Sequence, residues 1–398
     1  MIRDRSIVAL LTAEVISSLG SQMTWLALPW FVLVETGSAT RMGIVYATEL
    51  APIAILGIPA GSLVQRFGAR TTMLACDLVR APLVAAVPLL HAAGSLSFGL
   101  LLVLVALMGV FSTPYFALQR LILPEVVGSD EGLIGQANSL VEGASRLTAL
   151  VGPAAAGVLI AAIGATNVLW IDAATFLAAF ALVLGFVARR APTPDEKHAR
   201  GIFAGVRFVA GDRLILRAAT ASFLFGFLFP LLFASFPVLA YERYHADPRV
   251  AGALFAAWGG GSFLGAALAY RLVSRMPLLK LAGIAAVVCA LPLWLLVPDL
   301  PIWVMALVLV VSGGAIPCIN APYIALLSTR VPAALRAKVL QSLVTVNTLL
   351  GPIGFAVAGP LFVWLGIRGV YVVVAVLATL ASTVFLDGTM RSPAIVEA

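Results

Sequence analysis

The sequence predicts an all-α membrane protein with about twelve transmembrane helices in two pseudo-symmetric six-helix halves. The first observation is composition: 62% of the 398 residues are apolar and 11% are charged, whereas soluble proteins carry about 25% charged residues. The second is that the apolar residues form continuous runs long enough to cross the hydrocarbon of a bilayer. The third is a set of motifs that recurs in the same order in both halves of the chain.

Each apolar run is interpreted as a helix because it lacks the polar alternation of a membrane β-strand. A helix needs about 20 residues to cross the bilayer, and the first run is too long for the core of a cleavable signal peptide. A soluble multidomain protein, the alternative, would have too small a polar shell for this much apolar surface. The expected spans are residues 7–34, 40–63, 71–91, 97–119, 134–162, 167–188, 214–241, 249–270, 277–297, 301–327, 337–364 and 368–387.

The basic residues are distributed unevenly over the segments that join these spans. Alternate segments on one side carry 19 Lys and Arg residues and those on the other side carry 4, while Arg80 and Arg146 fall within spans. The positive-inside rule places the basic side, and with it both termini, in the cytoplasm. We therefore expect a multi-pass protein of the cell membrane. The formal charge of +7 reflects this topology, so no nucleic-acid partner is expected.

The two halves share short motifs at offsets near half the chain length. The matches are Pro114-Tyr115 with Pro322-Tyr323, Ser139 with Ser342, Gly152-Pro153 with Gly351-Pro352, and Arg66 and Arg70 with Arg271 and Arg275. The longest loop separates the two sets and contains the polar stretch APTPDEKHAR. We therefore expect an N-terminal half at 1–190, a cytoplasmic linker at 191–213 and a C-terminal half at 214–398. Such duplication is typical of carriers, whose substrate site lies between the halves near the membrane midplane.

The loop between the second and third spans carries a recognisable motif. This chain has Gly61, Leu63, Arg66, Gly68 and Arg70 there. Within a duplicated twelve-span chain, this pattern resembles the loop signature of the major facilitator superfamily, roughly G-x-L-x-D-R-x-G-R-R, with Arg70 one place out of register. The resemblance implies a conformational gate at this loop. Gln65 stands where the family has an acid that helps to latch the closed state, and it contributes no charge, so we expect a weaker latch.

Within the superfamily, the chain most resembles bacterial efflux carriers of the macrolide and enterobactin exporter type. The residues that carry this likeness are Ser17-Ser18-Leu19-Gly20, Asp77-Leu78-Val79-Arg80 and Val206-Arg207-Phe208. Gly152-Pro153 with Gly157 resembles the motif of drug:proton antiporters, although Ala156 replaces a usual glycine. The resemblance implies export by alternating access with a proton as the coupling ion, and Gly152-Pro153 as a pliant seam. Ser21 stands where relatives often carry an acid, which argues against simple transfer of their proton mechanism.

Three acids inside spans are candidates for carrying the coupling proton: Glu14, Glu49 and Asp172. A carboxyl group at a helix centre needs a partner, water or a function, and a buried one can exchange protons near neutral pH. The alternative for each acid is a hydrogen bond to a neighbouring helix, which we favour for Asp172. Asp77 with Arg80 and Glu142 with Arg146 have the spacing of local ion pairs, or belong to a charge network with the loop arginines.

The family resemblance also implies which residues line the substrate cavity, because spans one, four, seven and ten surround it. The candidates are Gln22, Trp25, Thr113, Tyr115, Phe225, Phe229, Phe233, Asn320 and Tyr323, and Arg146 in span five is a further candidate. The set is mostly aromatic and uncharged, which suits hydrophobic or amphiphilic compounds. The alternative is that these aromatic residues pack within the bundle or face lipid.

The sequence contains no pattern that favours an enzyme. It has no HExxH motif, no phosphate-binding G-x-x-x-x-G-K-S/T loop and three isolated cysteines, so no metal, cofactor or ATP-driven cycle is expected. The predicted partners are a small-molecule substrate, the lipid bilayer and the proton, and we expect a monomer. Three alternatives stay open: a lipid or lysolipid translocator of the same fold, a transport-inactive receptor or scaffold, and a nutrient uptake carrier.

Overall fold

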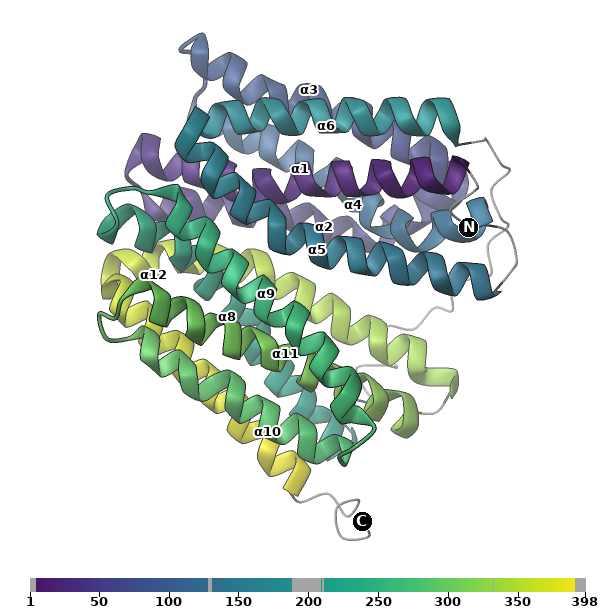
Figure 1. The fold of residues 1–398 in the computed structure, drawn as a ribbon, viewed down its shortest axis with the longest axis vertical. Helices are drawn as coiled ribbons and strands as arrows, with labels where there is room; N and C mark the ends of the chain where they lie inside the picture. The colour runs from purple at the N-terminus through teal and green to yellow at the C-terminus, as the bar shows by residue number, and fades with distance from the viewer. Residues whose placement is uncertain (1–4, 128–130, 188–208, 210, 332, 391–398) are drawn as a thin grey trace. The chain divides into compact units, whose positions relative to one another are not determined.

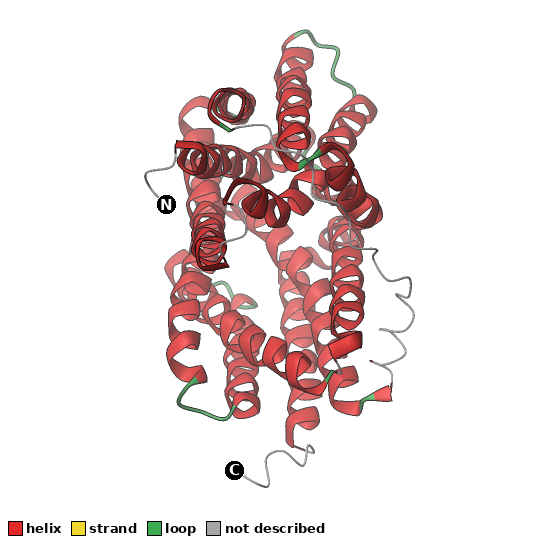
Figure 2. Ribbon diagram, turned by 90° about the vertical axis from the view of Figure 1, so that its right-hand side faces the viewer, coloured by secondary structure: helices red, strands yellow, loops and turns green. Residues whose placement is uncertain are grey.

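The computed structural model describes residues 5–127, 131–187, 209, 211–331 and 333–390, and every regular element in these ranges is helical. Figures 1 and 2 show the helices and their connecting loops. Ten helices in this part of the chain are long and apolar enough to cross a membrane, and one of them, Asn347–Asp387, contains a break. The predicted all-α membrane fold is therefore confirmed, and the number of spans is close to the predicted twelve.

The described residues form two compact units. The first contains six helices, α1 Arg5–Thr36, α2 Ala39–Phe67, α3 Ala69–Ala92, α4 Phe98–Val127, α5 Glu131–Ile163 and α6 Ala165–Phe186, together with segment 245–252. The second contains α8 Arg213–Arg243, most of α9 Pro248–Val273, α10 Leu278–Ala290, η1 Leu291–Leu296, α11 Ile302–Arg330 and α12 Ala333–Met390. The predicted linker at 191–213 lies almost wholly outside the described residues, as does the Val206-Arg207-Phe208 motif.

Helix α1 lies at the centre of the first unit, where it packs against α2, α5 and α6. Two glycines allow close approach of its neighbours. A Cβ atom at Gly20 would lie 2.1 Å from Thr175 Oγ1 and 2.3 Å from Asp172 Oδ1 on α6. A Cβ atom at Gly152 on α5 would lie 2.4 Å from Gln22 Cβ on α1. Small residues at such positions let membrane helices pack backbone to backbone.

In the second unit, α12 consists of two helical segments that meet at Gly366, where φ is 64°. Glycine adopts this left-handed conformation without the steric cost that a side chain would bring. The break separates the segments predicted as spans 337–364 and 368–387. Helices α9 and α11 approach closely, because a Cβ atom at Gly265 would lie 2.0 Å from the carbonyl oxygen of Gly314.

In each unit, a side chain near the start of the first helix donates a hydrogen bond to a carbonyl group near the end of the last helix. Ser6 Oγ on α1 donates to the carbonyl oxygen of Phe186 at 2.8 Å, and Arg217 Nη1 on α8 donates to that of Asp387 at 3.0 Å. These bonds satisfy carbonyl groups that have no partner within the helix. The second unit therefore repeats the helix-end contact of the first as well as its sequence motifs.

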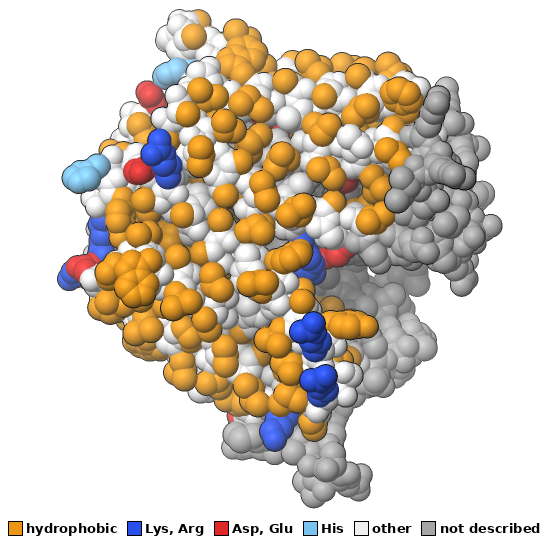
Figure 3. All heavy atoms as spheres, in the orientation of Figure 1, with side chains coloured by type: hydrophobic (Ala, Val, Ile, Leu, Met, Phe, Trp, Pro, Cys, Tyr) orange, Lys and Arg blue, Asp and Glu red, His pale blue; other side chains and the backbone are white. Residues whose placement is uncertain are grey.

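Large apolar side chains cover much of the surface, as Figure 3 shows for one face. Among them, Trp364 is 83% exposed, Ile55 is 71% exposed and Trp303 is 68% exposed. Contiguous apolar surface of this extent is unusual for a soluble monomer. It is the surface expected of helices that contact lipid, and it agrees with a multi-pass membrane protein.

Candidate functional site

A group of charged side chains is buried inside the first unit. Its members are Glu14 on α1, Asp77 and Arg80 on α3, and Asp172 on α6, which are 8%, 0%, 8% and 1% exposed. Charged groups are costly to bury unless they are paired or hydrogen-bonded. In the described part of the second unit, no charged side chain is buried to this degree. The buried charge cluster, as these four residues are called below, is thus the chemically distinctive feature of the interior.

Glu14 and Tyr115 are joined across the bundle. The Tyr115 hydroxyl on α4 donates a hydrogen bond of 2.6 Å to Glu14 Oε2. Both side chains are buried, at 8% exposure each. The structure therefore brings together one predicted proton carrier and one predicted cavity residue. A hydrogen bond to a charged carboxylate is stronger than one to a neutral carboxyl group. Loss of a proton from Glu14 would therefore strengthen the bond from Tyr115, and uptake of a proton would weaken it.

Asp172 is held by hydroxyl groups from two helices. Thr24 Oγ1 on α1 donates to Asp172 Oδ2 at 2.6 Å, and Thr175 Oγ1 on α6 donates to Oδ1 at 3.2 Å. Gly20 leaves the space in which α1 and α6 make this contact. The bond to Thr24 is the interhelical hydrogen bond that the sequence favoured for Asp172. Whether this acid also carries a proton stays a prediction.

Arg80 faces α1 and α6. Its Nη2 donates to Ser21 Oγ at 3.0 Å, and its guanidinium carbon lies 4.0 Å from the centroid of the Phe176 ring. Both carboxyl oxygens of Asp77 are buried and accept no hydrogen bond among the described residues. The direct Asp77–Arg80 pair suggested by the sequence spacing is therefore not formed. Their spacing places both residues on one face of α3. The guanidinium nevertheless contacts Ser21 on α1 and Phe176 on α6 instead of Asp77.

Glu49 on α2 extends the set of acids. Its Oε2 is buried and has no hydrogen-bond partner in the part of the chain that the structure describes. The Arg80 guanidinium interacts electrostatically with the carboxyl groups of Glu49, Asp77 and Asp172, and Asp77 also interacts with Glu14. All three predicted proton carriers therefore share the interior of the first unit with Arg80, the one arginine that is buried among the described residues of this unit.

A polar stripe on α1 connects these groups. Glu14, Ser17, Ser21 and Thr24 are spaced by three or four residues, which places them on one helix face. Ser21 and Thr24 contact the cluster, yet sequence reasoning singled out neither as a partner for it. The helical spacing of the stripe is the signal that could have found them. Phe176 carried no such signal, because its role depends on where α3 places Arg80.

The loop motif between α2 and α3 is only partly described. Gly61 and Gln65 lie in α2, but their side chains fall outside the description, so the effect of Gln65 on a latch stays a prediction. Gly68, with φ of 80°, separates α2 from α3. Arg70 Nε and Nη2 donate to the carbonyl oxygens of Val187 and Leu184 at 2.5 and 3.0 Å. Arg70 therefore caps the end of α6, while the Arg66 side chain is exposed.

The other candidates of the first unit occupy varied surroundings. Arg146 forms an ion pair with Glu142 at 2.7 Å on α5, and the two side chains are 46% and 65% exposed. Thr113 is buried and donates to the carbonyl oxygen of Gly109 within α4. Trp25 packs against Tyr46 with ring centroids 4.9 Å apart. None of these contacts tests a role in binding substrate.

An aromatic ladder runs through the second unit. Phe225, Phe229 and Phe233 stack along α8, with successive ring centroids 6.0 Å apart. Trp258 on α9 meets Phe229 and Phe233 edge to face at 5.6 and 5.8 Å. The four residues are called the aromatic ladder below. Trp258 was not among the predicted cavity residues.

Polar candidates of the second unit do not join this ladder. Asn320 is exposed, and Tyr323 packs beside a separate cluster that includes Ile215 and Leu327. A polar contact that the sequence did not predict links α8 to α12, where Asn347 Nδ2 donates to Ser222 Oγ at 3.0 Å. The predicted cavity set therefore divides into an aromatic part on α8 and scattered polar residues.

Comparisons with known proteins agree on one family. The family model described as Major Facilitator Superfamily matches residues 10–355. The protein named Multidrug efflux pump Tap from Mycolicibacterium fortuitum is 29% identical over 88% of each chain, and its namesake from Mycobacterium tuberculosis (strain ATCC 25618 / H37Rv) is 27% identical over 92% of this chain and 89% of the other. Among solved structures, a bacterial homolog of the human lysosomal transporter Spinster, in an inward-facing conformation, superimposes with a TM-score of 0.76 at 14% identity, covering 99% and 100% of the two chains.

Proposed function

Because the chain belongs to the Major Facilitator Superfamily, we propose that it is a proton-driven exporter of small hydrophobic or amphiphilic compounds that works by alternating access. Family membership makes it a transporter and not an enzyme. The proposed setting is the cell membrane, with both termini cytoplasmic and the protein active as a monomer. Drug export is the activity named for the relatives, and the buried charge cluster is the observation that carries the proposal for this chain.

The cluster supports proton coupling through its charge balance. Among the described residues of the first unit, the carboxyl groups of Glu49, Asp77 and Asp172 all interact with one buried guanidinium, that of Arg80. Full ionisation of these three acids would give the group a net charge of −2 in a poorly solvated interior, which is energetically costly. Protons are the counter-charges available to such a site. A change in access to water would therefore change how many protons it holds.

Glu14 and Glu49 are the proposed carriers of the coupled proton. Glu14 accepts a hydrogen bond from the Tyr115 hydroxyl on α4, so its charge state acts on the contact of α1 with α4. Glu49 has a buried oxygen that accepts no hydrogen bond from the described residues, so a proton there disrupts no existing contact. An inward proton gradient supplies about 2.3 kcal/mol per charge per 100 mV.

The aromatic ladder is the proposed contact surface for substrate. Phe229, Phe233 and Trp258 are partly exposed, while Phe225 is buried behind them in the stack. Apolar aromatic surfaces of this kind bind aromatic or amphiphilic molecules. The acids lie in the first unit and the aromatic ladder lies in the second. We therefore assign proton binding and substrate binding to different helices. Movement of the helices then couples the two.

Proton flux in liposomes tests the proposal. Purified protein is reconstituted with a pH-sensitive dye inside, a pH gradient is imposed, and a panel of macrolides, dyes and siderophores is added. Wild type is compared with Glu14→Gln, Glu49→Gln and the control Glu142→Gln, which removes an exposed acid from α5. We expect substrate-dependent flux that one of the first two variants abolishes and the control retains.

The opposite result has a defined meaning. Measurable compound binding without proton flux in the wild type would reject proton antiport. A lipid-flip assay on the same liposomes would then separate the lipid translocator from the transport-inactive receptor.

A further inference from the structure

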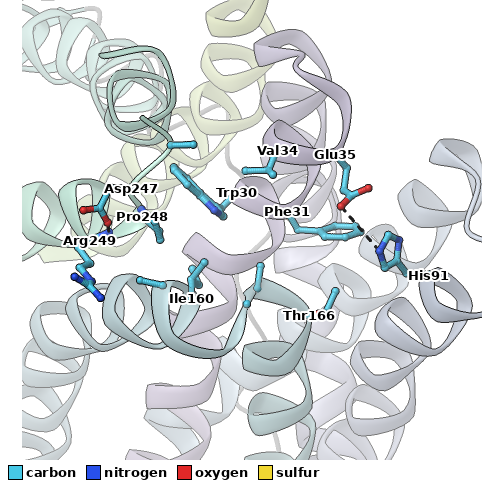
Figure 4. A pocket seen from close by; sticks show the side chains of 14 residues that line it. Trp30, Phe31, Val34, Glu35, His91, Ile160, Thr166, Asp247, Pro248 and Arg249 are labelled. Carbon is cyan, nitrogen blue, oxygen red and sulfur yellow. Dashed lines mark hydrogen bonds and ion pairs between the residues drawn. The ribbon is translucent and has the colours of Figure 1, made fainter. Parts of the chain in front are cut away.

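A cavity of about 620 Å³ opens among the helix ends of the first unit, away from the buried charge cluster. The end of α1, the end of α3, the junction of α5 with α6 and the segment that begins α9 line it, and all of its lining residues belong to the first unit. Figure 4 shows these side chains around the opening. Its volume is in the range of sites that hold drug-sized molecules.

The base of the cavity is apolar and aromatic. Trp30, Phe31 and Ile160 line it, and they are 3%, 7% and 6% exposed. The rings of Phe31 and His91 meet edge to face, with centroids 4.9 Å apart. A ligand would therefore bury apolar groups against rings that the surrounding helices hold in place, which favours binding without large rearrangement.

Glu35 and Asp247 bring two carboxylates to the cavity and Arg249 brings one guanidinium. Glu35 Oε1 lies 4.0 Å from His91 Nε2, and their side chains are 48% and 40% exposed. This distance is too long for a hydrogen bond, so the Glu35 carboxylate remains available to a ligand. Asp247, on the other side of Trp30 in Figure 4, accepts a bond of 2.9 Å from the Arg249 amide nitrogen at the start of α9. The lining residues from α5 and α6 carry no charge.

We propose that this cavity is a second ligand site, separate from the transport path, for an organic cation that carries aromatic or aliphatic groups. The cationic centre would lie between the Glu35 carboxylate and the indole of Trp30, since both attract positive charge. The apolar groups would occupy the space over Phe31 and Ile160. The site depends neither on proton coupling nor on the aromatic ladder, so it stands or falls independently of the proposed function.

Protection of an introduced cysteine from labelling tests the site directly. Thr166→Cys places a thiol in the cavity wall, and the native cysteines, Cys76, Cys289 and Cys318, are buried. The protein is held in lipid nanodiscs, where both faces are open to solution, and labelled with a membrane-impermeant maleimide with and without tetraphenylphosphonium. Ser95→Cys, in the exposed turn after α3 and outside the cavity, is the control. We expect the probe to slow labelling at position 166 at least fivefold and to leave position 95 unchanged.

A second substitution separates this cavity from binding elsewhere. Adding Glu35→Gln should raise the probe concentration needed for protection about fivefold, since a partly exposed charge pair is lost. Adding Glu242→Gln, at an exposed position on α8 outside the cavity, should not. Equal labelling with and without the probe would overturn the proposal. So would protection that persists unchanged in Glu35→Gln, because the probe would then act from another site.

Direct binding of radiolabelled tetraphenylphosphonium to the chain without introduced cysteines repeats the test without labelling chemistry. Glu35→Gln is a nearly isosteric change at a half-exposed position, so the variant should fold. A weaker binding component in this variant than in wild type is the expected result, and identical binding curves would reject the site.

Discussion

The two units differ in what they bury, although the same short motifs run through both. The first buries an arginine and three acids at 8% exposure or less. In the described part of the second unit, no charged side chain is buried to this degree, and α8 and α9 carry the aromatic ladder instead. The two units thus share backbone features, such as the helix-end contacts, but differ in the chemistry of their interiors.

One pair of equivalent residues makes the difference concrete. Tyr115 and Tyr323 both follow a proline in matching motifs 208 residues apart. The Tyr115 hydroxyl donates to Glu14, whereas the buried Tyr323 hydroxyl has no hydrogen-bond partner among the described residues. The position 208 residues after Glu14 is Ser222, which is bonded to Asn347. The tyrosine of this motif therefore donates to an acid in one unit and has no described hydrogen-bond partner in the other.

The largest effect is expected at Arg80, the buried cation of the first unit. Arg80→Gln would leave several buried carboxyl groups without their counter-charge. Breaking a buried charge pair costs about 3–5 kcal/mol, so we expect a marked fall in the thermal unfolding temperature in detergent. Arg146→Gln, which breaks the exposed pair with Glu142, should cost at most about 1 kcal/mol.

A compensating change sharpens this prediction. Asp172→Asn in the Arg80→Gln background removes one of the uncompensated acids and keeps a side chain of similar shape. We expect the double variant to recover part of the lost stability. If the two losses simply add, the charges of Arg80 and Asp172 are not coupled and the cluster is not one electrostatic unit.

The next effect is expected at Gly20. Gly20→Ala would place a methyl group within 2.3 Å of two oxygen atoms, Thr175 Oγ1 and Asp172 Oδ1, and would force α1 and α6 apart. Overpacking of this kind costs about 1–3 kcal/mol. Gly185→Ala on α6 meets no atom within 4 Å and is the matched control. Thermal unfolding measures both, and equal unfolding temperatures for the two variants would contradict the close approach.

The two tyrosines provide a paired test of the comparison itself. Tyr115→Phe removes the donor to a buried carboxyl group, which is worth about 1.5–3 kcal/mol when that group is charged. Tyr323→Phe removes a buried hydroxyl that has no described partner, so stability should stay constant or rise. Thermal unfolding again reports the difference. Equal losses at both positions would mean that the second unit also relies on its tyrosine hydroxyl.

The sequence predicted most of the fold because its signals are local. Run length and composition located most of the helices to within a few residues: the first span, expected at 7–34, is α1 at Arg5–Thr36. The span expected at 97–119 is a longer helix, α4 at Phe98–Val127. The separation of the last two spans, expected near 364–368, falls at Gly366, a glycine that can adopt positive φ. The family, inferred from the loop motif and the repeat, is confirmed by the match over residues 10–355.

The candidate site was predicted less completely because its contacts are between helices. Spacing showed that Asp77 and Arg80 share a helix face, but not that Phe176 and Ser21 would attract the guanidinium. Trp258 was overlooked because the family resemblance assigned the cavity to other spans, while the geometry brings α9 against α8. Residue type and periodicity identify candidates, and only packing decides their partners.

The smallest effect is expected at Trp258, and it distinguishes the tasks proposed for the two units. Trp258→Leu removes the edge-to-face contacts with Phe229 and Phe233 within the aromatic ladder, each worth about 0.5–1.5 kcal/mol. Substrate-dependent proton flux should then need a several-fold higher substrate concentration, with the maximal flux unchanged. Trp303→Leu, a 68% exposed tryptophan in the same unit, should leave the concentration dependence unaltered. If Trp258→Leu instead lowers the maximal flux at saturating substrate, the ladder takes part in proton coupling and the division of tasks between the units is wrong.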